Sequence, residues 1–185
     1  MKRFIAVFLI ALLVLLAGCG SVELSPEAEE LQGEWAYVHS EDLASLVLKP
    51  NGKAVFENDD YTYDCEDGRL ILTDSHGDQL SMRYALEDGG LVIYKQSTYT
   101  YSSLTEPDGV VGLWGDEDDN WSFEFTEDGT FREDGYFPGY YTVNEDEGTI
   151  KLVYNDQFED TVIYYSIDGY EMTVEYPWPM VPVEK

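Results

Sequence analysis

The densest group of residues that could do chemistry is an acidic run, Asp116-Glu117-Asp118-Asp119-Asn120. Carboxylate oxygens in a loop are ligands that suit Ca²⁺, which makes Asp116, Asp118 and Asp119 the weak candidates for a metal site. The run lacks the alternating acidic spacing and the distal Glu with which one loop wraps a calcium ion. We therefore favour the alternative, a solvated charge run that protects a loop or a sheet edge, and expect no metal.

The other reactive side chains do not predict catalysis. His39 and His76 stand in no nucleophile, metal or phosphate-binding motif. Two cysteines cannot form a four-thiolate zinc site, and we interpret Cys65 as a small buried strand residue. The sequence also has no glycine-rich phosphate loop and no Gly-x-Ser-x-Gly elbow. The expectation is a protein that is not an enzyme and needs no cofactor.

Aromatic residues give a stronger indication, because the chain has 15 Tyr and 4 Trp. Tyr and Trp are favoured at binding surfaces, where they bury a large area at a low entropy cost. The alternative is that tyrosine serves as a strand former with its hydroxyl in water. The candidate binding surface consists of Tyr99, Tyr101, Tyr136, Tyr140, Tyr141 and Trp178.

The N-terminal segment predicts where the protein is located. Lys2-Arg3 precedes an apolar run, Phe4–Leu16, which at about 13 residues is too short to span a bilayer and is typical of a signal peptide. The run ends in Leu16-Ala17-Gly18 followed by Cys19, which resembles the lipobox of bacterial lipoproteins. The resemblance implies that residues 1–18 are removed and that Cys19 carries diacylglycerol and a fatty acid such as palmitate. The protein would then be anchored to the cell membrane on its extracytoplasmic face.

The charge of the chain limits its partners. With 38 acidic and 10 basic residues the formal net charge is −28, and this charge repels phosphate backbones and anionic lipid head groups. We therefore exclude nucleic acid as a partner and expect the lipid anchor alone to hold the protein at the membrane. The partner that remains is an unknown protein or cell-envelope component.

The chain from residue 31 onwards contains an internal repeat. Gly33-Glu34-Trp35 returns as Gly112-Leu113-Trp114, 79 positions later, and Asp67-Gly68 returns as Glu147-Gly148, 80 positions later. Several landmarks in the same order at nearly constant offsets indicate a duplication.

Within each copy, apolar residues alternate with polar ones, as in Trp121, Phe123 and Phe125. This period of two is typical of antiparallel strands with one face inward and the other in water. Turn-forming pairs fall between the runs, and they are Asn51-Gly52, Asp67-Gly68, Asp88-Gly89, Asp128-Gly129, Glu147-Gly148 and Asp168-Gly169. We expect an all-β protein of up-and-down strands, about six or seven in each copy.

This pattern resembles the small lipocalin-like domains of bacterial lipoproteins. The resemblance rests on a short helical turn, opened by Ser25-Pro26, before Gly33-x-Trp35, and on the second motif, Gly112-x-Trp114, each followed by a strand–turn–strand hairpin. It implies that Gly33 and Gly112 open the first strand of each copy and that Trp35 and Trp114 close one end of a β-barrel, which is a structural role.

Two architectures are compatible with the duplication. One is two small barrels in tandem, and the other is a single larger sheet or barrel built from both halves. We favour two units, with a cleaved signal peptide before them. The expected segments are the signal peptide (1–18), the lipidated cysteine with a short acidic tether (19–30), repeat 1 (31–101), a linker (102–109) and repeat 2 (110–185).

The leading functional hypothesis is a non-enzymatic binding module of the cell envelope that uses its exterior. The alternative is a lipocalin-like carrier that holds a small apolar ligand inside a barrel. Fewer strands than in a full lipocalin, with aromatic and leucine side chains pointing inward, favour a filled interior over a cavity.

Overall fold

The computed structural model describes residues 24–40, 43–117, 121–155 and 158–183. The all-β antiparallel fold that the alternation and the turns predict is confirmed. Its elements are α2 (Pro26–Glu30), β1 (Gly33–Tyr37), β2 (Leu46–Leu48), β3 (Lys53–Phe56), β4 (Asp59–Glu66), β5 (Arg69–Thr73), β6 (Gln79–Glu87), β7 (Gly90–Tyr101), β8 (Gly112–Gly115), β9 (Ser122–Phe125), β10 (Thr130–Glu133), β11 (Phe137–Asn144), β12 (Thr149–Tyr154), β13 (Thr161–Asp168) and β14 (Glu171–Pro182).

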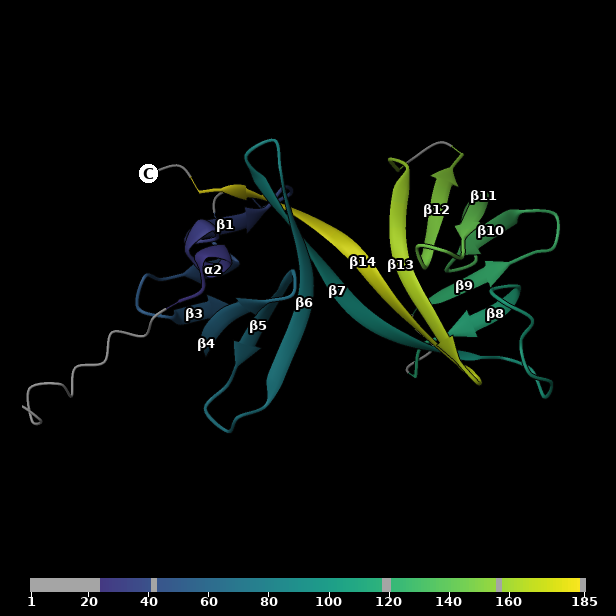
Figure 1. The fold of residues 1–185 in the computed structure, drawn as a ribbon. Helices are drawn as coiled ribbons and strands as arrows, with labels where there is room; N and C mark the ends of the chain where they lie inside the picture. The colour runs from purple at the N-terminus through teal and green to yellow at the C-terminus, as the bar shows by residue number, and fades with distance from the viewer. Residues whose placement is uncertain (1–23, 41–42, 118–120, 156–157, 184–185) are drawn as a thin grey trace, which may run out of the picture.

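The strands form one antiparallel sheet that closes into a ring. Each strand pairs with the next one along the chain, and β14 closes the ring by pairing with β1. β14 also pairs with β7 across the ring, from Met180↔Leu91 to Glu171↔Thr100. This pairing divides the ring into a first lobe, β1–β6, and a second lobe, β8–β13, which share β7 and β14. Figure 1 shows the two lobes side by side, with the two long strands running between them.

β7 begins in the first lobe and ends in the second, whereas β14 begins in the second lobe and ends in the first. Leu91 and Ile93 of β7 lie in the core of the first lobe, whereas Tyr99 of the same strand lies in the core of the second. β14 does the reverse, because Val174 lies in the second core and Met180 in the first. The two units that we expected in tandem therefore share one sheet, and no single cut in the chain separates their cores.

The two lobes contain corresponding hydrogen bonds. The Trp35 Nε1 donates to the Leu31 carbonyl at 2.9 Å, and Trp114 Nε1 donates to the carbonyl of Val110, also four residues back, at 2.8 Å. Each Trp thus ties its indole N–H to the segment that leads into its strand.

The turns set the register of the hairpins. Asp88 and Gly89 both have positive φ, 49° and 82°, as the two central residues of a tight hairpin turn require. In the β13–β14 hairpin, Asp168 pairs with Glu171, just as Glu87 pairs with Gly90. The residues that match Asp88-Gly89 are therefore 169–170, one position later than the Asp168-Gly169 pair that the sequence suggests.

The first lobe has a largely aliphatic core, which α2 helps to complete. Ser25 caps the helix by accepting a hydrogen bond from the Ala28 N–H at 3.2 Å. Leu24, Ala28 and Leu31 are buried in the first core. Residues 24–30, which we assigned to the tether, thus pack against the first lobe instead of extending away from it.

The second core is mainly aromatic. Trp114, Phe123, Phe125 and Phe131 are fully buried, and the ring centroids of Phe123 and Phe125 stack at 5.6 Å. Tyr141 closes on Phe125 edge to face at 4.9 Å. The protein's own rings therefore occupy the interior of this lobe, as the sequence predicts.

Candidate functional site

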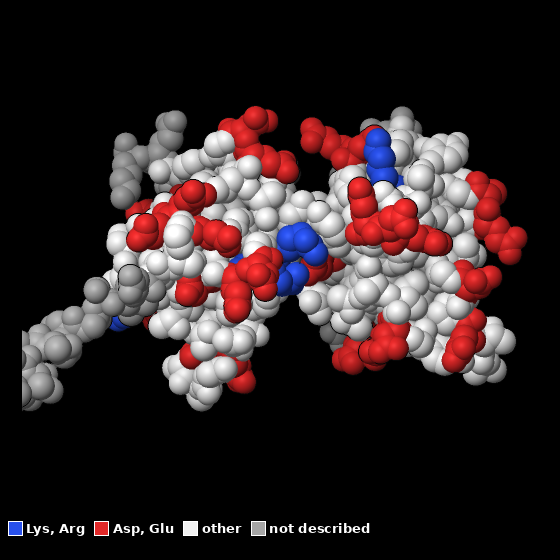
Figure 2. All heavy atoms as spheres, viewed as in Figure 1, with Lys and Arg blue, Asp and Glu red and all other residues white. Residues whose placement is uncertain are grey.

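A pocket of about 370 Å³ lies at the junction of the two lobes. Its lining comes from strands of both lobes and from the shared strands, and includes Arg69, Arg83, Gln96, Glu147, Gly148, Tyr164, Tyr165, Ser166, Thr173 and Glu175. On the face drawn in Figure 2, acidic side chains are spread over both lobes, one group of basic side chains lies at the junction, and further basic atoms lie on the second lobe. The junction is thus a local concentration of positive charge on an acidic surface.

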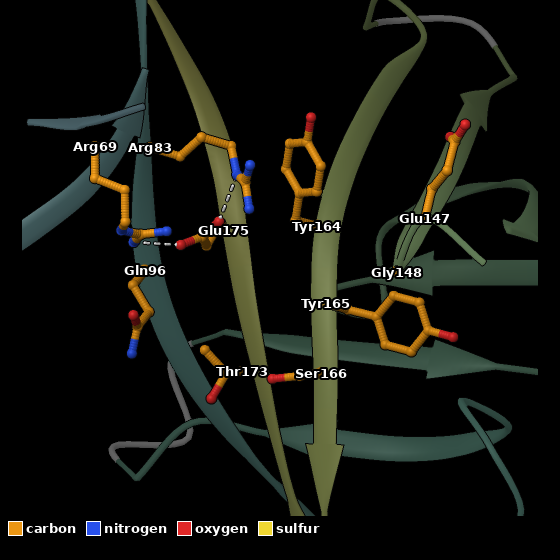
Figure 3. Close-up of a pocket in the computed structure, with 10 residues that line it drawn as sticks. All are labelled: Arg69, Arg83, Gln96, Glu147, Gly148, Tyr164, Tyr165, Ser166, Thr173 and Glu175. Carbon is orange, nitrogen blue, oxygen red and sulfur yellow. Dashed lines mark hydrogen bonds and ion pairs between the residues drawn. The ribbon is translucent and has the colours of Figure 1, made fainter. Parts of the chain in front are cut away.

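The central feature of the pocket is one carboxylate held by two guanidinium groups (Figure 3). The Arg69 Nη2 donates to the Glu175 Oε1 at 2.6 Å, and the Arg83 Nε donates to the Glu175 Oε2 at 3.1 Å. The side chain of Glu175 is 11% exposed, against 30% for Arg69 and 41% for Arg83. A carboxylate this buried needs partners of opposite charge, and the two arginines supply them.

The pairing of the strands explains why these three residues meet. Arg69 on β5 lies directly opposite Arg83 on β6, an arrangement in which two like charges would repel each other. Their neighbours Leu70 and Met82 point into the first core, so that the arginines point outward. Glu175 on β14, a strand shared by both lobes, supplies the negative charge that stabilises the pair.

Both guanidinium groups are held in place by further contacts. Arg69 donates from Nε to the Ser81 Oγ at 2.8 Å and from Nη2 to the Ser81 carbonyl at 3.0 Å. The Arg83 Cζ lies 4.0 Å from the centroid of the Tyr164 ring, a cation–π contact between the lobes. Tyr164 also packs edge to face on Tyr94 at 5.3 Å, and burial together with Tyr164 raises the pKa of Tyr94.

A second aromatic cluster surrounds Lys95 on β7. The Lys95 Nζ lies 4.8 Å from the Trp178 ring centroid and 5.1 Å from that of Tyr37, and it forms an ion pair with Glu57. Burial raises the pKa of Tyr37, and its hydrogen bond to Glu57 raises it further. Burial would raise the pKa of Glu57, but its hydrogen bonds from Lys95 and Tyr37 lower it overall. The cluster already holds its own cation.

The six aromatic residues of the expected surface do not lie together. Tyr136 and Tyr140 are 81% and 59% exposed on the second lobe, and Trp178 is 43% exposed on β14, where it packs on Tyr37 of the first lobe. Tyr99 is only 8% exposed and packs edge to face on Phe123 in the second core.

Two more of the six also face the second core. Tyr101 packs on Trp114 at a centroid distance of 4.9 Å, and the Tyr141 hydroxyl donates to the Thr126 carbonyl at 2.9 Å. Of the six, the exposed side chains are therefore those of Tyr136, Tyr140 and Trp178, and they lie in two separate places.

Of the weak calcium candidates, only Asp116 lies within the described residues. Its carboxylate accepts a hydrogen bond from the Trp121 N–H at 3.2 Å, whereas Asp118 and Asp119 lie outside the described part of the chain. The described residues contain no group of three His, Cys, Asp or Glu side chains placed to hold a metal ion.

The two cysteines are in different situations. Leu16, Ala17, Gly18 and Cys19 lie outside the described residues. Cys65 is buried in the first core, and this burial raises the pKa of its thiol to about 11. A thiol that stays protonated at neutral pH is a poor nucleophile, which agrees with a packing role for Cys65.

The four motif residues of the repeat open the two lobes. Gly33 and Gly112 begin β1 and β8, and Trp35 and Trp114 are buried in the first and second cores. Gly112 has a φ of 132°, and a Cβ atom there would lie 2.1 Å from the Tyr101 ring, so this position requires glycine.

Arg69, Arg83 and Glu175 are not among the site residues predicted from the sequence. The sequence did contain a signal for the two arginines, because each lies the same number of residues from His76, at the centre of the β5–β6 loop. Residues at equal sequence distances from the centre of a hairpin loop lie opposite each other on the two strands, as Arg69 and Arg83 do. No signal in the sequence pointed to Glu175, because its contact with Arg69 joins residues 106 positions apart.

Comparisons with known proteins gave no match to a family model, to a curated protein or to a solved structure. Among the described residues, none of the helices has the length and apolar character needed to cross a membrane.

Proposed function

We propose that the chain is a lipid-anchored protein of the extracytoplasmic face that binds a partner through its exterior and has no catalytic activity. In this proposal the two lobes are a duplicated pair of lipocalin-like barrels joined through β7 and β14. The observation that carries the proposal is the contrast between interior and junction. Buried side chains of the described residues pack together in each of the two cores, whereas the polar pocket lies between the lobes and opens to the outside.

The filled cores favour an exterior partner over the alternative of an apolar ligand carried inside a barrel. A ligand site needs a few hundred Å³ of space lined mainly by apolar groups with a few polar ones. In the second lobe, Phe123, Phe125 and Phe131 occupy that position, with ring centroids 5.6 Å and 6.2 Å apart. Apolar capture would require these rings to move.

The anchor would place the first lobe next to the membrane. Cys19 is the proposed lipid attachment site, and Leu24 is already buried in the first core. The five residue steps from Cys19 to Leu24 can span at most about 18 Å even in a fully extended chain. The second lobe, with exposed Tyr136 and Tyr140, would then point away from the bilayer, where it can meet a partner.

The anchor is tested by fractionating cells that produce the full chain with Cys19→Ser. We expect this variant to leave the membrane fraction and to lose incorporated radiolabelled palmitate, while the matched Cys65→Ser variant keeps both. Retention of the label in Cys19→Ser would contradict the proposed attachment site.

Binding is tested by placing a photo-crosslinking phenylalanine analogue at Tyr140, at Trp178 and, as a control, at Glu124, which is exposed on β9. We expect defined adducts from Tyr140 or Trp178 in intact cells and none from Glu124. Absence of adducts at both aromatic positions, combined with a stoichiometric apolar molecule seen by native mass spectrometry, would support the carrier instead.

A further inference from the structure

We propose that the pocket between the lobes binds a monosaccharide-sized ligand carrying one oxyanion, a carboxylate or a phosphate, which the guanidinium groups of Arg69 and Arg83 recognise. This inference deepens the proposed function and rests on it, since it names the ligand class of an exterior site.

The first observation is that the arginines keep unused hydrogen-bond donors. Arginine has five N–H groups, and Arg83 uses only Nε, in its ion pair with Glu175. No described residue accepts a hydrogen bond from the two terminal nitrogens of Arg83 or from the Nη1 of Arg69. These donors border the pocket, where an incoming ligand can reach them.

The second observation is the local charge. Two guanidinium groups share the single carboxylate of Glu175, so the cluster carries one net positive charge. The planar fork of a guanidinium group matches the two oxygens of a carboxylate or a phosphate. Glu147, which also lines the pocket, offsets this charge for the pocket as a whole, but it lies apart from the two guanidinium groups (Figure 3). An oxyanion placed against Arg69 and Arg83 therefore completes the charge balance and the hydrogen bonding of the cluster itself.

The third observation is that the rest of the lining suits hydroxyl groups. Gln96, Ser166 and Thr173 offer an amide and two hydroxyls, and Glu147 on the second lobe offers acceptor oxygens. The ring of Tyr164 is the aromatic part of the lining, whereas the ring of Tyr165, the next residue on β13, packs against the second core. A volume of about 370 Å³ is within the range of small-molecule sites. A ligand that matches this lining carries an oxyanion at one end and several hydroxyl groups at the other, as an acidic or phosphorylated sugar does.

The arginines are also held before any ligand arrives. Ser81 fixes Arg69 through two hydrogen bonds, and the Tyr164 ring supports the face of Arg83. Fixed donors lose little entropy on binding, which is why preorganised sites bind tightly. The net charge of −28 opposes an anion from a distance, but at physiological salt charges more than about 8 Å away are largely screened.

The test is isothermal titration calorimetry on the purified, lipidated full-length mature protein in neutral detergent at about 0.15 M salt. The probes are glucuronate for the carboxylate, glucose 6-phosphate for the phosphate, and neutral glucose. We expect one of the two anionic sugars to bind at least about tenfold more tightly than glucose, because only an oxyanion can form charge-assisted hydrogen bonds with the guanidinium groups. The stronger of the two identifies the oxyanion.

Variants separate recognition from stability. Arg83→Gln should weaken the binding of the anionic sugar at least about tenfold. Arg132→Gln, the same change at an exposed position on β10, should leave the binding affinity unchanged. Arg83→Lys keeps a positive charge near Glu175 but removes the fork, so it should fold with a normal unfolding midpoint and still bind more weakly.

The proposal is overturned if neither anionic sugar binds better than glucose, or if Arg83→Lys binds as the wild type does. Crosslinks from Tyr140 or Trp178 that persist alongside such a result would leave the proposed exterior binding intact and reject only this ligand class.

Discussion

The two lobes have the same arrangement of strands but different side chains in their cores. Leu46 and Leu48 of the first lobe have Phe123 and Phe125 at the matching places in the second, 77 positions later, and all four side chains are buried. Turns and backbone hydrogen bonds correspond, while the volume of the core residues does not. The arrangement of the strands therefore depends on the alternation of apolar and polar residues and on the turns. The core side chains can change as long as their total volume occupies the interior.

One pair of facing positions shows how large and small core side chains compensate for each other. In the first lobe Ala54 on β3 pairs with Tyr61 on β4, and in the second Phe131 on β10 pairs with Gly139 on β11. The large and the small residue have changed strands. A Cβ atom at Gly139 would lie 2.5 Å from the Phe131 ring and 2.3 Å from the Val153 carbonyl oxygen. The large ring of the second lobe thus requires glycine opposite it.

The lobes also differ in how they are completed. The first uses α2, through Ala28 and Leu31, whereas residues 102–111 before β8 form no helix and supply only Val110 to the second core. The bulkier aromatic core of the second lobe takes up the space by itself. A helix and a set of larger rings are two solutions to the same packing requirement.

The largest expected effect comes from breaking the Phe131–Gly139 pair. Phe131→Ala should lower the free energy of unfolding by about 3–5 kcal/mol, as for other buried Phe→Ala changes. Gly139→Ala should cost roughly 1–3 kcal/mol by overpacking, and less in a Phe131→Ala background because one of its two close contacts is gone. Chemical denaturation of the four proteins measures this coupling, and strictly additive losses would contradict the exchange of large and small residues.

A second prediction concerns the contact that joins the lobes. Glu175→Gln should lower the free energy of unfolding by roughly 1–3 kcal/mol, since it leaves two partly buried guanidinium groups without their shared carboxylate. The control is Glu124→Gln, an exposed residue on β9, which should change stability little. Equal effects of the two substitutions in thermal unfolding would show that the ion pairs do not stabilise the junction.

A smaller effect is expected at the helix that only the first lobe has. Ser25→Ala removes the cap of α2 and the hydrogen bond from the Ser25 Oγ to the Cys65 carbonyl, and should cost about 1 kcal/mol. Ser103→Ala, in the exposed loop before β8, is the matched control. Hydrogen exchange should show faster exchange in the first lobe alone, and faster exchange in both lobes would argue against a local role of the helix.

The smallest prediction concerns pH and the carboxyl group of Glu133 in the second lobe. Glu133 lies where the first lobe has Phe56, and it accepts a hydrogen bond from the Tyr154 hydroxyl at 2.5 Å. Burial raises the pKa of Glu133, with Asp134 adding to the rise and the Tyr154 hydrogen bond opposing it. A carboxyl whose pKa is higher in the folded than in the unfolded state stabilises the fold when protonated, and this contribution is lost as pH rises through the folded pKa.

The stability of the wild type relative to Glu133→Gln should therefore fall as pH rises from about 4.5, the ordinary pKa of the group, towards the raised value. Urea unfolding of both proteins at several pH values measures the difference in their free energies of unfolding. The contributions of the other carboxylates are common to both proteins and cancel in this difference. A difference that rises with pH would mean that the hydrogen bond from Tyr154 outweighs burial.

The sequence by itself determined the strands, several of the turns and the repeat. Alternation places one face of each strand in the core, and Asp-Gly pairs such as Asp88-Gly89 supply the backbone angles of tight hairpins, so local residues are sufficient for these features. Tertiary structure alone decided that β7 and β14 pair along their length and that Tyr99 enters the second core while Tyr136 stays exposed. It also brought Arg69 and Glu175 together across 106 positions. The reason is physical: a period of two shows that a strand has two faces, but which face is covered depends on the strand beside it, and that neighbour can lie anywhere in the chain.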